Sequence, residues 1–204
     1  MGWYAEHVVP RVVDAMCANA RMLPLRQRAL AQAAGTVLEL GFGSGGNLPA
    51  YPDTVTRVLA VDPSLVGRRL AQDRIAAARA DVQFVDVDGQ ELPLEDGSVD
   101  TAVTTWTLCT IPDAVQAVAE VRRALRPGGR LLFLEHGLSP DARTARWQHR
   151  LDPVQQRIAG GCHLDRDIRA LIESGGMPIE RCDNFSIAGP GPWSYMYAGA
   201  ARAT

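Results

Sequence analysis

Glycines and carboxylates gathered between residues 39 and 62 are the residues whose types and spacing most clearly suggest chemistry. A short apolar run, Val37–Leu40, is followed by four glycines, at positions 41, 43, 45 and 46. Such a density of glycine lets the backbone take positive φ and brings free N–H groups close to a ligand. Asp62 ends the next apolar run about 20 residues beyond the first glycine, where a carboxylate can accept hydrogen bonds from both ribose hydroxyls. The spacing predicts half of a nucleoside-binding site.

Glu39 narrows the kind of nucleoside that this loop would hold. A carboxylate two positions before the first glycine would repel a pyrophosphate but could hold a cationic ligand, directly or through water. S-Adenosylmethionine carries an ammonium and a sulfonium and no phosphate, so it is favoured. A dinucleotide or another nucleoside is one alternative, and a turn whose glycines only relieve strain is another. The expected cofactor site in this stretch comprises Glu39, Gly41, Phe42, Gly43, Gly45, Asn47 and Asp62.

Two further strand ends carry residues suited to the same ligand. Asp88 follows the third apolar run and can accept a hydrogen bond from an adenine amino group, and Gly89 can bring a backbone N–H to the ring. Trp106 follows Thr105 at the end of the fourth run, where a large aromatic either walls a pocket or fills the core. The pocket is favoured, because ligands of open α/β sheets bind outside the carboxyl ends of the strands where the strand order reverses.

Five apolar runs alternate with helical segments through the first two thirds of the chain. The runs predict strands at residues 37–40, 57–61, 82–85, 99–105 and 130–135. Helices are predicted at 65–80, with Ser64 as N-cap, and after Asp113, which caps a helix that ends at 126–129. Alternation with short links excludes an all-β fold and a helix bundle, and it predicts an α/β sheet.

Two helices are predicted before the first strand. Apolar residues from Val8 to Ala20 recur at three-to-four spacing, and Pro24 separates this helix from a second one at 25–34. Arg26 and Arg28 form a basic face that is interpreted as solvated, with contact to a membrane surface as the alternative. Helices placed before the first strand of a nucleoside-binding fold are expected to act as a lid over the ligand.

Composition places the chain among soluble globular domains. Its 204 residues are 47% hydrophobic and 22% charged, with a formal net charge of −2, which suits one domain and offers no basic surface for nucleic acid. The N-terminal residues lack the charged and apolar regions of a secretory signal, and no apolar run reaches the roughly 18 residues of a membrane span. A cytoplasmic protein is expected.

The four cysteines are far apart in the sequence, at positions 17, 109, 162 and 182. They form no C-x-x-C pair, so neither a disulfide framework nor a zinc knuckle is indicated. His163 stands beside Cys162, but no second close pair completes four ligands. Buried free thiols, and no metal site, are therefore expected.

The motifs also carry a family resemblance. Four segments resemble the ordered motif set of class I S-adenosylmethionine-dependent methyltransferases: LELGFGSG, LAVDP, DGQELPLEDGSVD and LRPGGRLLFLEH, within residues 35–136. Three more are similar to a small branch that includes animal thiol S-methyltransferases: VTTWTLCTIPD, LEH and the run at 151–176, with Trp193, Tyr195 and Tyr197 near the end. The chain departs from that branch in showing no N-terminal hydrophobic anchor.

This resemblance implies a fold and a set of roles. The fold is a Rossmann-like, seven-stranded, mostly parallel sheet with helices on both faces, whose last two strands lie at about 179–185 and 195–201. Residues 1–204 form one domain, with a helical lid (1–34), a cofactor-binding core (35–136) and a substrate-side insert with the last strands (137–204). The cofactor contacts are Glu39, Gly41, Gly43 and Gly45 at the methionine moiety, Asp62 and Pro63 at the ribose, Asp88 and Gly89 at adenine, and Thr105 and Trp106 at the floor.

The acceptor side offers three candidate residues. Methyl transfer from a sulfonium is an in-line displacement, so a base is needed only when the nucleophile is protonated. A thiol with a pKa of about 8.5 needs only modest assistance from the protein to lose its proton. The candidates for promoting this deprotonation are His136, at the end of the fifth strand, and Asp152 and His163, in the insert. Each has an ordinary alternative: a backbone hydrogen bond for His136, an N-cap role for Asp152 before Pro153, and a surface position for His163.

The expected function is methyl transfer from S-adenosylmethionine, which becomes S-adenosylhomocysteine, to a small-molecule acceptor, preferably a thiol. Methylation of a quinone-type ring at carbon or of a lipid head group at nitrogen is one alternative, and a sensor or scaffold that binds the cofactor without catalysis is another. A wide apolar pocket would favour the quinone, and a narrower one lined by the two histidines the thiol. Neither nucleic acid nor a membrane is the expected partner.

Overall fold

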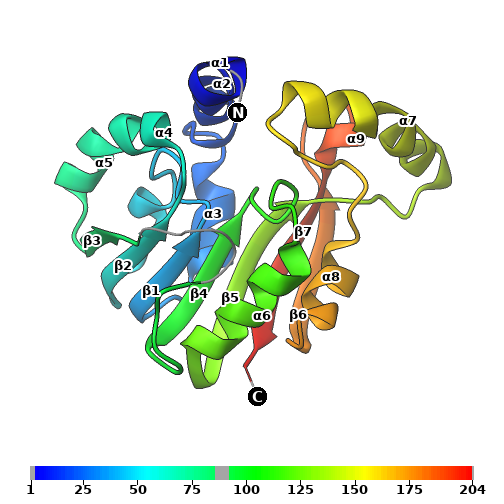
Figure 1. Cartoon of the computed structure of the whole chain (residues 1–204). Coiled ribbons are helices and arrows are strands. Elements are labelled where there is room, and N and C mark those ends of the chain that lie inside the picture. Colours follow the sequence, from blue (N-terminus) through cyan, green and yellow to red (C-terminus); the bar gives the residue numbers. More distant parts are fainter. Residues whose placement is uncertain (1–2, 86–91, 204) are drawn as a thin grey trace.

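The computed structural model describes residues 3–85 and 92–203, which form one sheet with helices on both faces (Figure 1). The sheet order is β3-β2-β1-β4-β5-β7-β6. Neighbours from β3 through β5 are parallel, whereas β7 is antiparallel to β5 and β6. The seven-stranded, mostly parallel sheet expected from the sequence is confirmed. The strands are β1 (Gly35–Leu40), β2 (Val55–Val61), β3 (Asp81–Phe84), β4 (Val99–Thr105), β5 (Leu125–His136), β6 (Ile179–Ser186) and β7 (Tyr195–Arg202).

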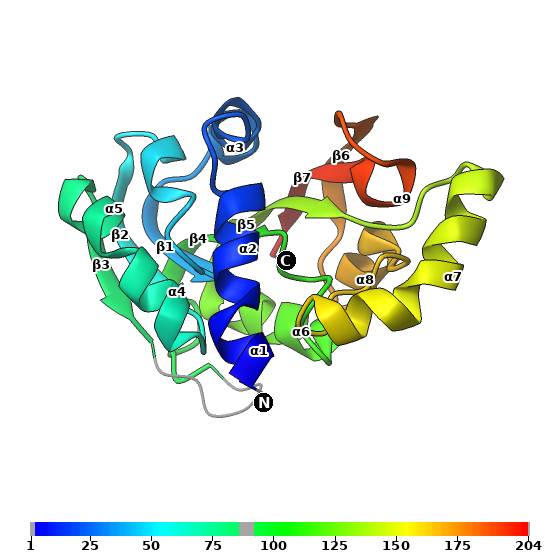
Figure 2. The same ribbon diagram turned by 90° about the horizontal axis from the view of Figure 1, so that it is seen from above.

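Nine α-helices and one 3₁₀ turn occupy the described residues. They are α1 (Trp3–His7), α2 (Val9–Cys17), α3 (Leu23–Leu30), η1 (Leu48–Ala50), α4 (Leu65–Leu70), α5 (Gln72–Ala77), α6 (Ala114–Ala124), α7 (Ala142–Ile158), α8 (Ile168–Ser174) and α9 (Gly191–Ser194). Helices α1, α2 and α7 lie above the carboxyl ends of the parallel strands, and Figure 2 looks down on that edge. That edge is where sequence reasoning placed the ligand.

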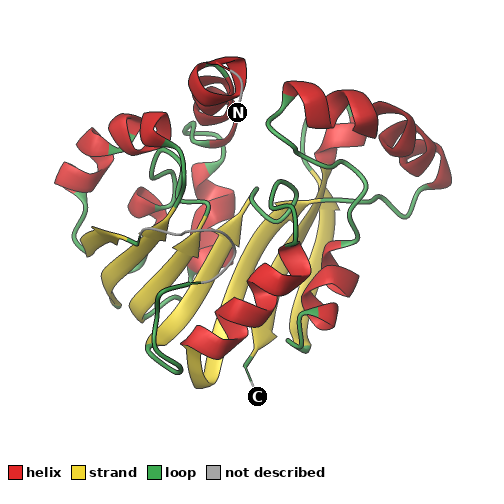
Figure 3. Cartoon of the chain, viewed as in Figure 1, coloured by secondary structure: helices red, strands yellow, loops and turns green. Residues whose placement is uncertain are grey.

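The alternation of side chains along the central strands explains why helices cover both faces of the sheet (Figure 3). In β5, Leu131 and Phe133 belong to the apolar cluster that contains residues of α6 and α8. Leu132, between them, belongs to the cluster that contains residues of α3 and η1. Because successive side chains of a strand point to opposite faces, an uninterrupted apolar strand needs both helical layers.

Local signals in the sequence predicted several helix starts. Ser64 Oγ accepts a hydrogen bond from Gly67 N at 3.0 Å at the start of α4, and the Asp113 carboxylate accepts one from Gln116 N at 2.9 Å at the start of α6. Both predicted N-caps are confirmed. The segment 65–80, predicted as one helix, forms two, which meet at Ala71.

For two polar residues, Arg26 and Asp152, an interpretation made from the sequence is wrong. Arg26 is 5% exposed and points into the molecule, so its assignment to a solvated or membrane-facing surface is wrong, whereas Arg28 is exposed as expected. Asp152 is not an N-cap, because it lies inside α7, whose N-cap is Asp141. Its buried carboxylate instead accepts a hydrogen bond from Leu164 N at 2.7 Å.

The N-terminal segment forms α1 and α2, where one helix was predicted. The apolar repeat that predicted this helix does not become core, since Val12, Val13 and Met16 are exposed. None of the helices within residues 3–85 and 92–203 combines the length and the apolar character that crossing a bilayer requires.

Candidate functional site

The glycine-rich loop leaves the carboxyl end of β1 with three glycines in the left-handed region. Gly41, Gly43 and Gly45 have φ values of 70°, 54° and 75°. A Cβ at Gly41 would lie 2.0 Å from Thr107 Oγ1, so packing excludes a side chain there. A Cβ at Gly43 would have only the Gly41 carbonyl oxygen within 4 Å, at 3.9 Å. Gly43 therefore borders free space in front of the loop.

Asp62, at the carboxyl end of β2, holds this loop in place. One carboxylate oxygen accepts a hydrogen bond from Gly43 N and the other from Ser64 N, each at 2.7 Å. Burial raises the pKa of Asp62, although both N–H donors oppose this. Each oxygen keeps a second lone pair, so the carboxylate can still accept hydrogen bonds from a ligand. Pro63 follows directly and is exposed.

Glu39 lies in the middle of the sheet and is almost completely buried. Its carboxylate accepts hydrogen bonds from Asn47 Nδ2 at 2.9 Å and from the Tyr51 hydroxyl at 2.6 Å. Burial raises the pKa of Glu39 to about 7, and the two donors limit the rise. The result is a carboxyl group that sits near its titration point at neutral pH, beside the glycine loop.

Arg26 supplies a cation to this network from α3. It donates to Asn47 Oδ1, to Thr105 Oγ1 at 2.9 Å and to the Cys17 carbonyl oxygen at 2.8 Å. Its guanidinium carbon lies 4.8 Å from the centre of the Trp106 ring. Its Nε is buried without a hydrogen-bond partner in the described part of the chain. Arg26 thus connects the glycine loop to the end of β4.

The end of β4 is strained and firmly held. Among the described residues, Trp106 is the one non-glycine residue with positive φ, 53°. Its N–H donates to the Leu134 carbonyl at 3.0 Å, and the next N–H, of Thr107, donates to the buried Glu135 carboxylate at 2.9 Å. Burial raises the pKa of Glu135 to about 7. Strain of this kind persists only where the surroundings enforce it, and it is frequent at ligand sites.

Helix α2 crosses over the same edge of the sheet (Figure 2). Its Asp14 accepts hydrogen bonds from Ser44 Oγ in the glycine loop at 2.5 Å and from Arg74 at 2.8 Å. Towards α7, a Cβ at Gly160 would lie 3.3 Å from Val9 Cγ1. The helix therefore reaches from the glycine loop to the segment that follows α7.

His136, at the carboxyl end of β5, faces two cysteines. Its Nε2 lies 3.2 Å from Cys162 Sγ, which lies 3.6 Å from Cys109 Sγ. The predicted alternative, a hydrogen bond from the ring to a backbone carbonyl, is not seen among the described contacts. Although burial opposes it, the contact with Cys162 raises the pKa of His136. All four cysteines are free; Cys109 is buried and the other three are half-buried.

Asp152 and His163 come together at the carboxyl-terminal end of α7. His163 Nδ1 lies 3.4 Å from an Asp152 oxygen and 3.1 Å from Gln156 Nε2. The His163 side chain is 29% exposed, so it borders the solvent rather than the core. The structure thus brings the three predicted acceptor-side residues to the same edge of the sheet in two groups, His136 with the cysteines and Asp152 with His163.

Of the remaining predicted cofactor residues, Phe42 and Thr105 are described by the structure. Asp88 and Gly89 lie outside the described residues. Phe42 is buried and packs edge-on against Phe84 with ring centres 5.4 Å apart, so its side chain fills the core beneath the loop. Thr105 is buried and accepts the Arg26 hydrogen bond described above.

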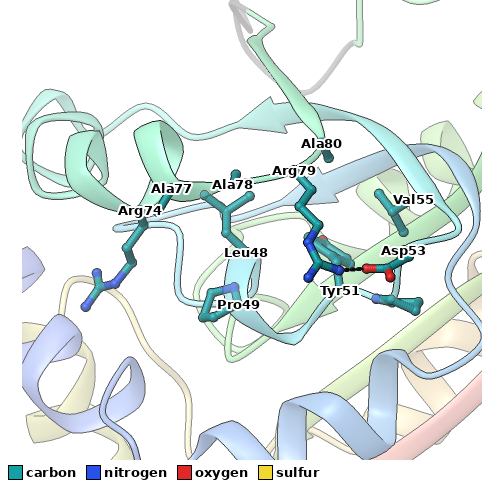
Figure 4. Close-up of a pocket in the computed structure, with 11 residues that line it drawn as sticks. Leu48, Pro49, Tyr51, Asp53, Val55, Arg74, Ala77, Ala78, Arg79 and Ala80 are labelled. Atoms are coloured by element: carbon teal, nitrogen blue, oxygen red, sulfur yellow. Dashed lines mark hydrogen bonds and ion pairs between the residues drawn. The ribbon is translucent and has the colours of Figure 1, made fainter.

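A cavity of about 340 Å³ lies between η1 and the end of α5 (Figure 4). Leu48, Tyr51 and Ala78 line it, and an ion pair between Arg79 and Asp53 crosses it. None of the predicted cofactor residues that the structure describes lines this cavity. The cavity therefore lies beside the candidate site, and Tyr51, which donates to Glu39, is part of its wall.

Comparison with known proteins identifies the family. Residues 38–133 match the family model described as a methyltransferase domain. The chain is 34% identical over 176 residues to the thiol S-methyltransferase TMT1B of Homo sapiens, which covers 82% of this chain and 70% of the human protein. It belongs to the class I S-adenosylmethionine-dependent methyltransferases.

Other relatives of this methyltransferase differ in the acceptor that their names state. TMT1B of Rattus norvegicus is 35% identical over 145 residues, 68% of this chain but only 58% of the rat protein. The quinone biosynthesis C-methyltransferase UbiE of Methylobacterium nodulans is 34% identical over 118 residues, 57% of this chain and 44% of that protein. A geranyl diphosphate methyltransferase solved with S-adenosylmethionine shares the fold, with a TM-score of 0.70 at 15% identity, covering 90% of this chain and 85% of the other.

Sequence reasoning missed several residues of the methyltransferase site. Arg26 could have been found, because it lies on one stripe with the buried Ala29, Leu30 and Ala33, at i, i+3, i+4 and i+7. Cys109 gave no local signal, because its neighbours in the site are 27 and 53 positions away in the sequence. Cys109, His136 and Cys162 meet only because β4 and β5 pair side by side and the segment after α7 packs against their ends.

Proposed function

We propose that this methyltransferase transfers the methyl group of S-adenosylmethionine to the sulfur of a small thiol. The observation that carries the proposal is the extent of the likeness to thiol S-methyltransferases, which covers 82% of this chain, against 57% for the quinone enzyme. The longer match extends well beyond residues 38–133, which match the methyltransferase domain model. The substrate-side part of the chain therefore contributes to it.

The glycine loop and its neighbours fit the cofactor. The space in front of Gly43 and the second lone pair on each oxygen of Asp62 suit a ligand that carries a sugar. We propose that Asp62 and Pro63 hold the ribose, and that Glu39, Asn47 and the loop glycines hold the methionine moiety. The proposal keeps three further assignments from the sequence. Phe42 belongs to the loop, Asp88 and Gly89 contact adenine, and Thr105 and Trp106 form the floor of the cofactor pocket.

The N-terminal helices complete the site from above. Asp14 binds the glycine loop and Val9 approaches the segment after α7, which supports a role of α2 in covering a bound cofactor and excluding water. We propose that residues 1–34 act as a lid, that 35–136 bind the cofactor and that 137–204 form the acceptor side. A cytoplasmic location stays a prediction.

The chemistry requires alignment and a deprotonated acceptor. When bound, S-adenosylmethionine supplies an electrophilic methyl group on a sulfonium sulfur. The Trp106 turn and the end of β5 position the acceptor in line with that group. His136 acts at the acceptor through its contact with the cysteines, and the Asp152 and His163 pair forms the rim. A thiol becomes reactive once its proton is removed.

A panel of acceptors tests the proposal. Purified protein, labelled S-adenosylmethionine and matched thiols, amines, phenols and quinols should give a methyl thioether as the main product. Methylation of a quinol ring at carbon would favour the second candidate function, which the likeness to the quinone enzyme supports. Cofactor binding without any methylated product would indicate a sensor or scaffold instead.

A further inference from the structure

Cys109, His136 and Cys162 form a compact cluster on three different segments. Cys109 follows β4, His136 ends β5, and Cys162 follows α7. One ligand atom of each residue lies within 4.8 Å of the ligand atoms of the other two. The group is largely enclosed, since two of the three residues are buried.

Two of the three distances within the cluster are close to those between the corners of a tetrahedral metal site, and the third, between Cys109 and His136, is within 4.8 Å. Zinc bonds of about 2.3 Å to sulfur and 2.0–2.1 Å to nitrogen, at tetrahedral angles, separate two sulfurs by ~3.8 Å and a sulfur from a nitrogen by ~3.6 Å. The two sulfurs are 3.6 Å apart, and His136 Nε2 is 3.2 Å from Cys162 Sγ. For these two distances, side-chain movements of a few tenths of an ångström would accommodate a metal ion.

Hydrogen bonding alone does not account for the buried imidazole. His136 Nδ1 is enclosed and has no partner in the part of the chain that the structure describes. Its Nε2 faces sulfur, which is a weak hydrogen-bond partner. A buried ring with so little compensation is unusual. A metal bound at Nε2 would replace the weak contact with sulfur by a strong bond, while Nδ1 would still need a partner such as a water or a ligand.

The backbone around the cluster is fixed independently of any metal. His163 N donates to the Cys109 carbonyl at 2.8 Å, which ties the Cys162 segment to the Cys109 turn. Arg166 clamps that turn by donating to the carbonyls of Leu108 and Ile111, the latter at 2.7 Å. The ligand atoms are thus held together by contacts that do not involve their side chains, as a metal site requires.

We propose that Cys109, His136 and Cys162 bind a zinc ion whose fourth position receives the acceptor thiol. Two thiolates and an imidazole are a zinc ligand set, and three protein ligands with one open position are typical of reactive zinc sites rather than structural ones. The role of the open position rests on the proposed thiol function. No local motif predicted this site, because its ligands are 26, 27 and 53 positions apart in the sequence.

The proposed step balances without an oxidant or reductant. The acceptor thiol binds zinc and releases its proton to solvent, because a coordinated thiol is deprotonated. A sulfur lone pair forms the new S–CH₃ bond, and the electron pair of the broken C–S⁺ bond stays on the sulfur of the cofactor. The neutral thioether product is a weaker ligand than a thiolate and leaves the metal.

Metal content measured by mass spectrometry tests the site without reference to activity. Protein reduced, stripped with a chelator and dialysed against zinc should bind about one ion per chain. Cys109→Ser and Cys162→Ser should lower zinc affinity at least ~10-fold, and Cys182→Ser, the matched control on β6, should not. Cobalt in place of zinc should give thiolate-to-metal absorption that both site variants weaken. Unchanged melting temperatures and S-adenosylhomocysteine binding would show that the variants are folded.

The outcomes separate the metal site from the thiol function. Thiol methylation that falls on chelation and returns with zinc supports both. Thiol methylation by protein that binds no zinc overturns the metal site and leaves the function standing. Zinc bound with no thiol methylated upholds the site and overturns its role in the reaction. A Cys109–Cys162 disulfide in protein that takes up no zinc after reduction would assign the cluster to redox chemistry and overturn the proposal.

Discussion

The two halves of the proposed site, a cofactor half and an acceptor half, are built in opposite ways. The cofactor half takes most of its groups from one continuous stretch, residues 39–62, in which one strand, one loop and the next strand end deliver Glu39, Gly43 and Asp62. The acceptor half takes Cys109, His136 and Cys162 from three segments that meet only in the folded sheet. A half that is local in sequence can be recognised by its motif, whereas a half assembled from distant segments has no motif.

Replacement of Gly43 should have the largest effect on the cofactor half. In Gly43→Val, the β-branched side chain would resist a φ of 54° and occupy the space in front of the loop, so cofactor affinity should fall by at least ~100-fold. The matched control is Gly97→Val, at a φ of 65° in a turn before β4. The control should lose stability but retain binding by calorimetry. Full binding by Gly43→Val would mean that the loop is structural only.

Removal of the Asp62 carboxylate should have the next largest effect. Asp62→Ala should weaken S-adenosylhomocysteine binding by roughly 2 to 3 kcal/mol, because a charged acceptor for two hydroxyls and for Gly43 N is lost. Asp81→Ala, at an exposed carboxylate on β3, is the control and should bind normally. Equal affinities of the two variants in calorimetry would contradict the ribose assignment.

The raised pKa of Glu39 predicts a smaller effect that depends on pH. A cationic ligand favours the carboxylate, so binding below the pKa of about 7 must release a proton. Affinity should rise about tenfold between pH 6 and pH 8 and then level off. The charged and titratable groups that influence Glu39 are Arg26, Tyr51 and Asp62. Glu39→Gln should abolish this rise of affinity with pH. If the variant keeps the pH dependence of the wild type, Glu39 does not bind the cationic part of the ligand.

The same pKa has a consequence for the free protein. The folded pKa of Glu39 lies above its unfolded value, so its contribution to stability is complete below about pH 4.5 and is lost as the pH rises through about 7. Glu39→Gln should therefore lose less stability than the wild type between these values. Denaturant titrations at several pH values measure this difference.

Disruption of the α2 contact should have the smallest effect. Asp14→Asn weakens a half-exposed ion pair with Arg74 and the bond from Ser44, which is worth about 1 kcal/mol or less. Cofactor dissociation should become a few times faster in stopped-flow measurements, while the melting temperature stays the same. Asp73→Asn, exposed in α5, is the control. Identical dissociation rates for the two variants would argue against a lid role for α2.

The sequence predicted the fold well because local patterns determine it. Apolar runs located all five parallel strands, and Ser64 and Asp113 cap helices as expected. The fifth strand begins at Leu125 rather than at 130, in the segment that was predicted to end the preceding helix. Prediction from the sequence failed where tertiary contacts override local preference. Arg26 looks like a surface residue until the buried Asn47 and Thr105 supply acceptors for its guanidinium. Asp152 precedes a proline, yet its carboxylate serves a loop twelve positions later in the chain.

The most direct test of the account is the position of the transferred methyl group on an acceptor that carries two nucleophiles. A small molecule with both a thiol and a phenol, such as 4-mercaptophenol, binds once and offers sulfur and oxygen to the same site. With ¹³C-methyl-labelled S-adenosylmethionine, nuclear magnetic resonance should show the label on sulfur only. A label on oxygen or on ring carbon would contradict the proposed thiol acceptor.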